Sequence, residues 1–167
     1  DGFVMFGDLA HVSSSSSAAV TAPTRGVAIA RDHPDFRPPQ SYRLVHTLTG
    51  ANPVWIWQPL PQNDDFAALG CVVTRSSAPP APELVRCVPR KVLVAVQRDK
   101  LQQRQLWASC APFSTCFDER HAHATHSEPC LPFALWRLPR CNTFVAYAGS
   151  HSLPADAAFF AFPPTAA

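Results

Sequence analysis

Cysteine and histidine side chains gather between residues 116 and 130, in the stretch CFDERHAHATHSEPC. Their sulfur and nitrogen atoms are of the kind that zinc prefers. The candidate ligands are Cys116, His121, His123, His126 and Cys130. The histidines follow His-x-His and His-x2-His spacings, which match none of the usual spacings of structural zinc sites. We therefore expect no metal and no other cofactor, and interpret the stretch as a solvated polar loop.

Disulfides are the alternative use of these cysteines. The chain has six cysteines, and Cys116 has two candidate partners, Cys130 and Cys110. Either pairing requires an oxidising compartment. Cys71 and Cys87 lie in apolar, strand-like stretches, where a small buried thiol in a reducing compartment is the better interpretation.

Catalysis has little support in the sequence. Asp118, Glu119 and His121 are neighbours, but a catalytic triad is defined by geometry and not by adjacency. The chain contains no Gly-x-Ser-x-Gly elbow, phosphate-binding loop or His-Glu-x-x-His motif. We predict no catalytic residue and no enzymatic activity. A hydrolase that uses Cys116 or Cys130 with a histidine is the enzyme hypothesis that we keep, behind two others given below.

Positive charge is concentrated between residues 86 and 104, where Asp99 is the single acid. The basic residues are Arg86, Arg90, Lys91, Arg98, Lys100 and Arg104. One interpretation is an ordinary solvated segment. The other is an electrostatic rim that contacts an acidic protein or an anionic phospholipid surface.

Two tryptophans in the stretch VWIWQP raise the question of what covers them. In a strand, Trp55 and Trp57 point to one face, while Val54 and Ile56 point to the other. Both faces are therefore apolar. The tryptophans either pack inside the protein or, together with Pro59, line an edge groove for a Pro-containing peptide.

Composition fits one globular domain without a nucleic-acid partner. The chain has 167 residues, of which 47% are hydrophobic and 16% charged, and its net charge is +2. That charge is too mild to argue for nucleic acid. The 18 prolines disfavour long helices. No apolar run is long enough for a membrane span, and the first residues lack the pattern of a secretory signal.

The elements that must position these residues are short strands separated by turn signals. The hydrophobic pattern predicts strands over 26–30, 41–48, 54–57, 66–74, 83–88, 91–96, 106–109, 133–138, 143–149 and 157–162. One or two more are expected in the first twelve residues. Residues 13–26 are a polar loop, and 97–105 is the one helix-compatible stretch. The fold class is therefore all-β, a β-prism or β-sandwich with very little helix.

A weak internal repeat accompanies this pattern. Trp57, Pro59 and Phe66 share a frame with Trp136, Pro139 and Phe144. In addition, Phe6–Gly7 matches Leu69–Gly70, whereas Tyr147–Ala148 takes that place in the third copy. We expect three hairpin-like units around a shared core, in one module over residues 1–167 that belongs to a larger chain or assembly.

The same residues carry a family resemblance. An Ile-Trp-x-Pro strand, a Leu-Gly-x-Val-Val strand, a Pro-containing loop and an Arg-Cys-Val strand follow one another. The matching positions are Ile56, Trp57, Pro59, Phe66, Leu69, Gly70, Val72, Val73, Pro79, Pro80, Arg86, Cys87 and Val88. The FGD at 6–8 and PFALW at 132–136 also fit. The chain resembles the repeated all-β module of the vacuolar-protein-sorting families, found in bridge-like lipid-transfer proteins and in plant and fungal relatives. Asn63, Asp64 and Asp65 replace the Pro-x-Gly turn of that pattern.

The resemblance implies a non-enzymatic adaptor-binding module that docks short Pro-containing peptides at an organelle. The chain is also similar to the multivesicular-body-associated β-prism, which implies contact with acidic membranes. We therefore expect a recognition module that is cytoplasmic and peripheral to organelle membranes, with a protein or peptide partner. The alternative is an architectural domain that binds no small ligand.

Overall fold

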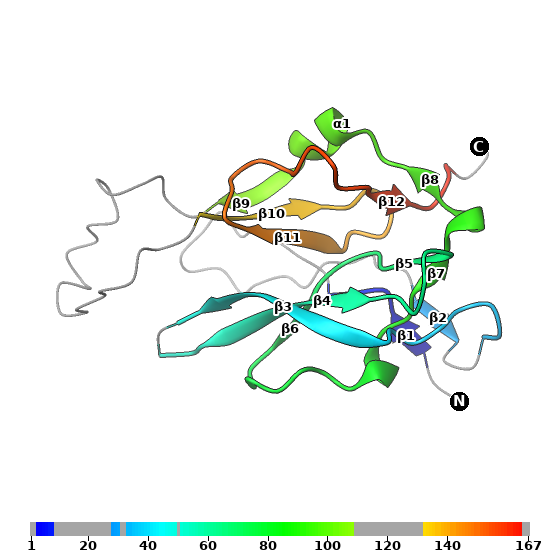
Figure 1. Cartoon of the computed structure of the whole chain (residues 1–167), viewed down its shortest axis with the longest axis horizontal. Helices are drawn as coiled ribbons and strands as arrows, with labels where there is room; N and C mark the ends of the chain where they lie inside the picture. Colours follow the sequence, from blue (N-terminus) through cyan, green and yellow to red (C-terminus); the bar gives the residue numbers. More distant parts are fainter. Residues whose placement is uncertain (1–2, 9–27, 31–32, 50, 109–131, 165–167) are drawn as a thin grey trace, which may run out of the picture.

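The protein is built almost entirely from short antiparallel strands in the computed structural model (Figure 1). The structure describes residues 3–8, 28–30, 33–49, 51–108 and 132–164. The first strands are β1 (Phe3–Met5), β2 (Ala28–Ala30), β3 (Ser41–Leu48), β4 (Val54–Leu60), β5 (Phe66–Ala67) and β6 (Val72–Thr74). The later ones are β7 (Val88–Pro89), β8 (Val94–Ala95), β9 (Gln105–Ala108), β10 (Phe133–Arg137), β11 (Phe144–Ala148) and β12 (Phe160–Ala161). The predicted all-β class is confirmed.

These strands form five small sheets. The two largest have the orders β3-β4-β6 and β11-β10-β9, and the pairs β1-β2, β5-β7 and β12-β8 complete the described fold. Within the described residues, helical structure is confined to α1 (Arg98–Gln102) and to two 3-10 turns, η1 (Pro82–Leu84) and η2 (Arg90–Val92). In Figure 1, β3, β4 and β6 lie below β9, β10 and β11. No helix of the described residues is long and apolar enough to cross a bilayer.

Strand β10 is buried on both faces, which makes it the centre of the fold. Phe133 packs with Ile56, Cys71 and Phe144 between the two three-stranded sheets. Ala134 and Trp136 point the other way, into a cluster with Phe6, Leu69, Val88, Leu101, Leu138, Leu153 and Phe159. This alternation follows from the two-residue period of a strand. The stretch FALWR is apolar at four consecutive positions because both faces are covered.

Three segments distant in sequence meet beneath this core. The Asp8 N–H donates to the Cys71 carbonyl oxygen at 2.9 Å, and the Cys71 N–H donates to the Phe144 carbonyl oxygen at 2.7 Å. A Cβ at Gly7 would lie 3.0 Å from the Gly70 Cα, and a Cβ at Gly70 would lie 2.7 Å from the Thr143 Cβ. Gly70 therefore meets the third segment at Thr143, next to the start of β11, and the alignment of Tyr147–Ala148 with the two glycines stays a prediction.

Several predicted strands differ from the observed ones. The predicted strand over 83–88 is wrong at its start, because Pro82 opens η1. Its remainder makes only isolated bridges, Met5 with Val85 and Arg37 with Cys87, before β7. The stretch 66–74 is two strands, β5 and β6, which pair with β7 and β4. The expected antiparallel pairing of the Trp57 strand with the 66–74 stretch is thus formed by β4 and β6, whereas β5 pairs with β7.

Strand β4 extends past its predicted end, through Pro59 to Leu60. Proline lacks the N–H that a central strand needs. Strand β6 pairs with β4 only from Trp55 to Trp57. Beyond Trp57 the strand has β3 as its one paired neighbour, with Tyr42 opposite Pro59. The proline is tolerated because it stands where the sheet has only two strands.

Candidate recognition site

The two faces of β4 have different surroundings, and this answers the question raised by its tryptophans. Trp57 is 7% exposed, and Pro59 is fully buried. The Trp57 Nε1–H donates to Thr74 Oγ1 at 2.8 Å, and the Tyr42 hydroxyl donates to the Ala81 carbonyl oxygen at 3.2 Å. The segment after β6 thus returns to this face and helps to cover it. Trp55, nearer the sheet end, is half-buried.

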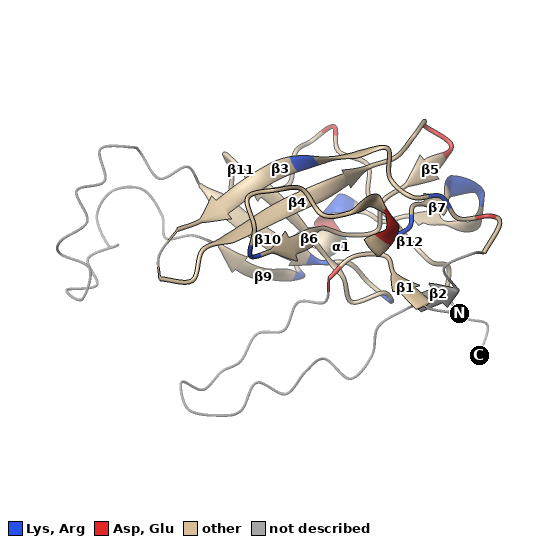
Figure 2. Ribbon diagram, turned by 90° about the horizontal axis from the view of Figure 1, so that it is seen from below, with Lys and Arg blue, Asp and Glu red and all other residues tan. Residues whose placement is uncertain are grey.

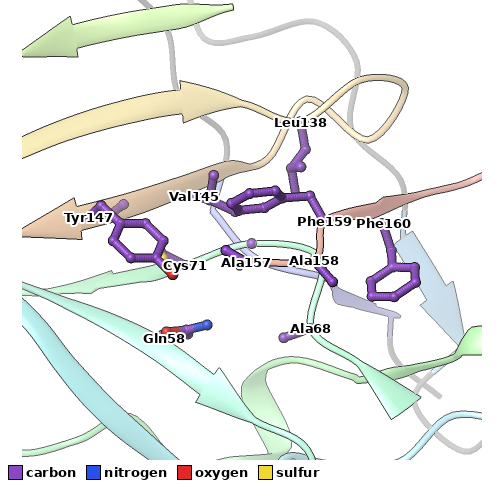
Figure 3. A pocket seen from close by; sticks show the side chains of 12 residues that line it. Gln58, Ala68, Cys71, Leu138, Val145, Tyr147, Ala157, Ala158, Phe159 and Phe160 are labelled. Carbon is purple, nitrogen blue, oxygen red and sulfur yellow. The ribbon is translucent and has the colours of Figure 1, made fainter. Parts of the chain in front are cut away.

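The opposite face of β4 borders a cleft between the β3-β4-β6 sheet and the β11-β10-β9 sheet (Figure 3). We call this the inter-sheet cleft. Gln58 and Ala68 lie at the bottom of the view in Figure 3, and Cys71, Gly70 and Ala146 also line the cleft. The remaining lining residues come from the position just after β10, from β11 and from the chain before and in β12: Leu138, Val145, Tyr147, Ala157, Ala158, Phe159 and Phe160. The cleft therefore has aromatic side chains and one amide side chain on its walls.

The polar atoms of the cleft are held in fixed directions. Arg43 Nη2 donates to Gln58 Oε1. Figure 3 shows the Gln58 amide nitrogen on the side toward Ala68, away from that oxygen. Burial raises the pKa of the Tyr147 hydroxyl, so the group is neutral and can donate or accept a hydrogen bond. Gln58 thus presents N–H donors beside an aromatic wall.

The size of the cleft limits what it can hold. Its volume is about 80 Å³. Cofactor and metabolite pockets are typically several times larger, on the order of 300–1,000 Å³. A volume of this size has room for about three waters at roughly 30 Å³ each, or for one small side-chain ring. The inter-sheet cleft fits a single residue of a partner chain better than a free small molecule.

The predicted electrostatic rim is divided among different places, and Figure 2 shows its basic positions spread over several elements. Arg86 is 8% exposed and donates from Nη1 to the carbonyl oxygens of Glu83 and Val85. Arg98 donates from Nε and Nη2 to the Leu153 carbonyl oxygen. These two arginines stabilise the fold locally.

The other four rim residues line two separate surface clefts. Arg90 and Lys91 lie beside Asp35, Asp64 and Asp65, so their cleft has mixed charge. The Arg90 guanidinium also lies 4.9 Å from the centre of the Phe160 ring. Lys100 and Arg104 line a different cleft together with Arg140. Sequence reasoning missed Arg140, because it is distant in sequence and only the turn after β10 brings it near α1.

The described cysteines are poorly suited to catalysis. Cys71, Cys87 and Cys141 are free and buried. Burial raises the thiol pKa of Cys71 and of Cys87 to about 12, so the reactive thiolate is scarce at neutral pH. Within the described part of the chain, no group of three or more His, Cys, Asp or Glu side chains could hold a metal ion. The candidate ligands from Cys116 to Cys130, and Cys110, lie outside the described residues.

Most of the chain matches one known protein family. The family model described as vacuolar protein sorting-associated protein 62 matches residues 1–119. The chain belongs to this family. The resemblance to the vacuolar-protein-sorting families is thereby confirmed at the level of the family. Comparisons with curated proteins and with solved structures give no match.

The family match ends before β10, but the fold does not. Trp136, Leu138 and Phe159 lie beyond residue 119 and share one core cluster with Phe6 and Leu69. The inter-sheet cleft likewise takes Gln58 and Cys71 from the matched part and Tyr147 from the part beyond it. The candidate site is therefore built by both parts of this vacuolar-sorting chain.

Proposed function

We propose that this chain is a non-enzymatic recognition module in vacuolar or endosomal sorting, and that it docks a Pro-containing segment of a partner protein. Membership of the vacuolar protein sorting-associated family supports the sorting role. The observation that carries the recognition role is the inter-sheet cleft, whose walls are aromatic and which has room for one ring. Operation at membrane contact sites in lipid transfer, on the cytoplasmic side, is part of this proposal.

The chemistry of the cleft favours proline over other residues. Segments rich in proline adopt an extended helix without internal hydrogen bonds, and aromatic-lined grooves bind it at low entropic cost. In the proposed complex, a proline ring packs between Tyr147 and Phe159. The Gln58 amide nitrogen then donates to a carbonyl oxygen of the peptide. Fixing of Gln58 by Arg43 lowers the entropy lost on binding.

The test is a binding titration with a fluorescent peptide that carries two prolines in a polar, extended sequence. The same peptide with alanines in place of the prolines is the ligand control. Tyr147→Ala should weaken binding about tenfold or more, because a buried aromatic contact is worth at least about 1.4 kcal/mol. Tyr147→Phe should bind nearly as well as the native chain.

Matched variants distinguish this site from the outer face of β4. Leu44→Ala removes an exposed side chain on the neighbouring strand, 46% exposed, and should leave binding unchanged. Trp55→Ala tests the groove expected from the sequence. Loss of binding in Trp55→Ala but not in Tyr147→Ala would move the site to the outer face. If neither proline peptides nor anionic liposomes bind, the architectural alternative replaces the recognition role.

A further inference from the structure

A second cleft, at the free edge of β8, is lined by three cations and by no carboxylate of the described chain. We call it the basic cleft. Its volume is about 330 Å³, and its lining comprises residues 94–97, Lys100, Arg104, Pro139 and Arg140. It shares no lining residue with the inter-sheet cleft. Three like charges around one hollow create a local potential that attracts anions.

The cations are positioned by buried neighbours. Leu101 is fully buried and anchors α1 to the core. Lys100 lies in α1, and Arg104 lies in the turn that follows, where its N–H donates to the Leu101 carbonyl oxygen at 2.9 Å. Arg140 comes from the turn between β10 and β11, where its φ is 68°. Its Nη1 donates to the Phe162 carbonyl oxygen, which fixes the guanidinium beside β12.

Lys100 and Arg104 differ from Arg86 and Arg98 in their side-chain contacts. Arg86 and Arg98 use guanidinium N–H groups on backbone carbonyl oxygens. Within the described chain, the side chains of Lys100 and Arg104 make no hydrogen bond or ion pair, and both residues are exposed. Their charges are therefore available to a ligand at this surface.

The backbone of β8 adds directional groups to the charge. The Val96 N–H donates to the Phe159 carbonyl oxygen at 2.8 Å, and Ala95 stands opposite Phe160. Bonded and non-bonded pairs alternate in an antiparallel ladder. The N–H and C=O of Ala95 therefore point away from β12. Ala95 is exposed and lines the basic cleft.

We propose that the basic cleft binds an acidic segment of a partner protein as an added strand. The segment pairs with the Ala95 N–H and C=O, and its carboxylates contact Lys100, Arg104 and Arg140. An extended peptide uses both a backbone donor and a backbone acceptor. A phosphate headgroup has acceptors for the N–H and the cations but no donor for the C=O. The outward C=O of Ala95 thus favours a peptide over a lipid.

The experiment measures fluorescence anisotropy of a labelled peptide that alternates Glu and Val, titrated with the native chain. Arg104→Glu should raise Kd about tenfold or more, since one charge-assisted hydrogen bond is worth about that factor. Arg75→Glu makes the same change at an exposed position after β6, outside the cleft, and should leave Kd within about twofold because it loses no direct contact. Equal weakening by both variants would reduce the site to non-specific charge attraction and overturn the proposal.

Two further measurements test strand addition itself. Ala95→Pro removes the outward N–H but no bond to β12, so the fold should be retained and peptide binding weakened. A peptide with N-methylated backbone amides keeps every carboxylate and should bind more weakly than the parent. Undiminished binding of the methylated peptide, or binding of phosphatidylserine vesicles in place of the peptide, would overturn the proposal. None of these measurements involves Tyr147 or the proline peptide. The acidic-segment proposal can therefore fail while the proline-binding proposal holds, and the reverse.

Discussion

Gly70 lies so close to Thr143 that a Cβ at position 70 would be 2.7 Å from the Thr143 Cβ. The neighbouring Cys71 N–H donates to the Phe144 carbonyl oxygen at 2.7 Å, and Thr143 Oγ1 donates to the Leu69 carbonyl oxygen. This contact joins the segment before β6 to the start of β11. Gly70 and Cys71 also line the inter-sheet cleft. The geometry of the candidate site therefore depends on a close backbone approach that only glycine permits.

Gly70→Ala should lower the free energy of unfolding by about 1–3 kcal/mol or more, the usual cost of overpacking a core. The added methyl group meets the Thr143 side chain, both of whose nearest atoms are within 2.9 Å. Denaturant unfolding measures the effect. The double variant Gly70→Ala with Thr143→Gly should recover part of the loss relative to the two single variants. Strict additivity of the two losses would show that the two residues do not compete for this space.

Truncation of the buried tryptophans should destabilise far more than truncation of an exposed one. Trp57 and Trp136 are 7% and 0% exposed, whereas Trp107 is 44% exposed. Trp57→Ala and Trp136→Ala should each cost about 3–5 kcal/mol, as large aromatics in cores do. Trp107→Ala is the matched control and should cost clearly less. Similar thermal midpoints for Trp57→Ala and Trp107→Ala would contradict the burial of Trp57.

Ionisation of Asp8 should destabilise the fold. Burial raises the pKa of its carboxyl above 3.8, and the hydrogen bond from the Val73 N–H only partly opposes this. The folded state then holds the proton more tightly, so this group's contribution to stability falls as pH rises from 3.8 through the folded pKa. Asp8→Asn keeps an acceptor for Val73. It should unfold at a higher temperature than the native chain at pH 7, and lose that advantage in acid. A lower midpoint for Asp8→Asn at pH 7 would contradict this.

Protonation of His46 should destabilise the fold as the pH falls below neutrality, which is the reverse of the pH dependence expected for Asp8. Its ring stacks on Phe133 at 4.2 Å between centroids, and burial lowers its pKa below 6.5. The folded state disfavours the imidazolium, so stability is lost as pH falls from 6.5 through the folded pKa. His46→Phe keeps an aromatic ring against Phe133 and removes the titration. The difference in thermal midpoint between the native chain and His46→Phe should change as the pH falls from 6.5. A difference that stays constant would show that His46 does not titrate in this way.

Strand positions with strong local patterning were predictable from the sequence. The bounds of β3 agree with the alternating stretch SYRLVHTL, and β10 with the apolar stretch FALWR. The stretch containing Leu84 to Cys87 was not, because its pairing is decided by single bridges to Met5 and Arg37. Those partners are distant in sequence, and no local period records them.

The sequence likewise indicated only part of the candidate site. The sequence directed attention to β4 through Trp55 and Trp57, yet Gln58, on the other face, lines the inter-sheet cleft. Its aromatic wall comes from Tyr147 in β11 and from Phe159, just before β12. In the sequence both residues look like ordinary core positions. Likewise, Lys100 and Arg104 belong to the basic segment, but Arg140 reaches them only through the turn after β10. Sites built across elements follow from tertiary packing, which one sequence does not display.

In the proposed complex, the inter-sheet cleft receives a proline from a partner chain. Titration of the isotope-labelled protein with the two-proline peptide, followed by backbone amide NMR shifts, tests it most directly. We expect saturable shifts at Ala146, Tyr147, Ala158 and Phe159, which line the cleft, and no comparable shifts with the alanine peptide. Shifts centred on Trp55 and Thr47, which pair on the outer face of the β3-β4-β6 sheet, would contradict it, as would an unchanged spectrum.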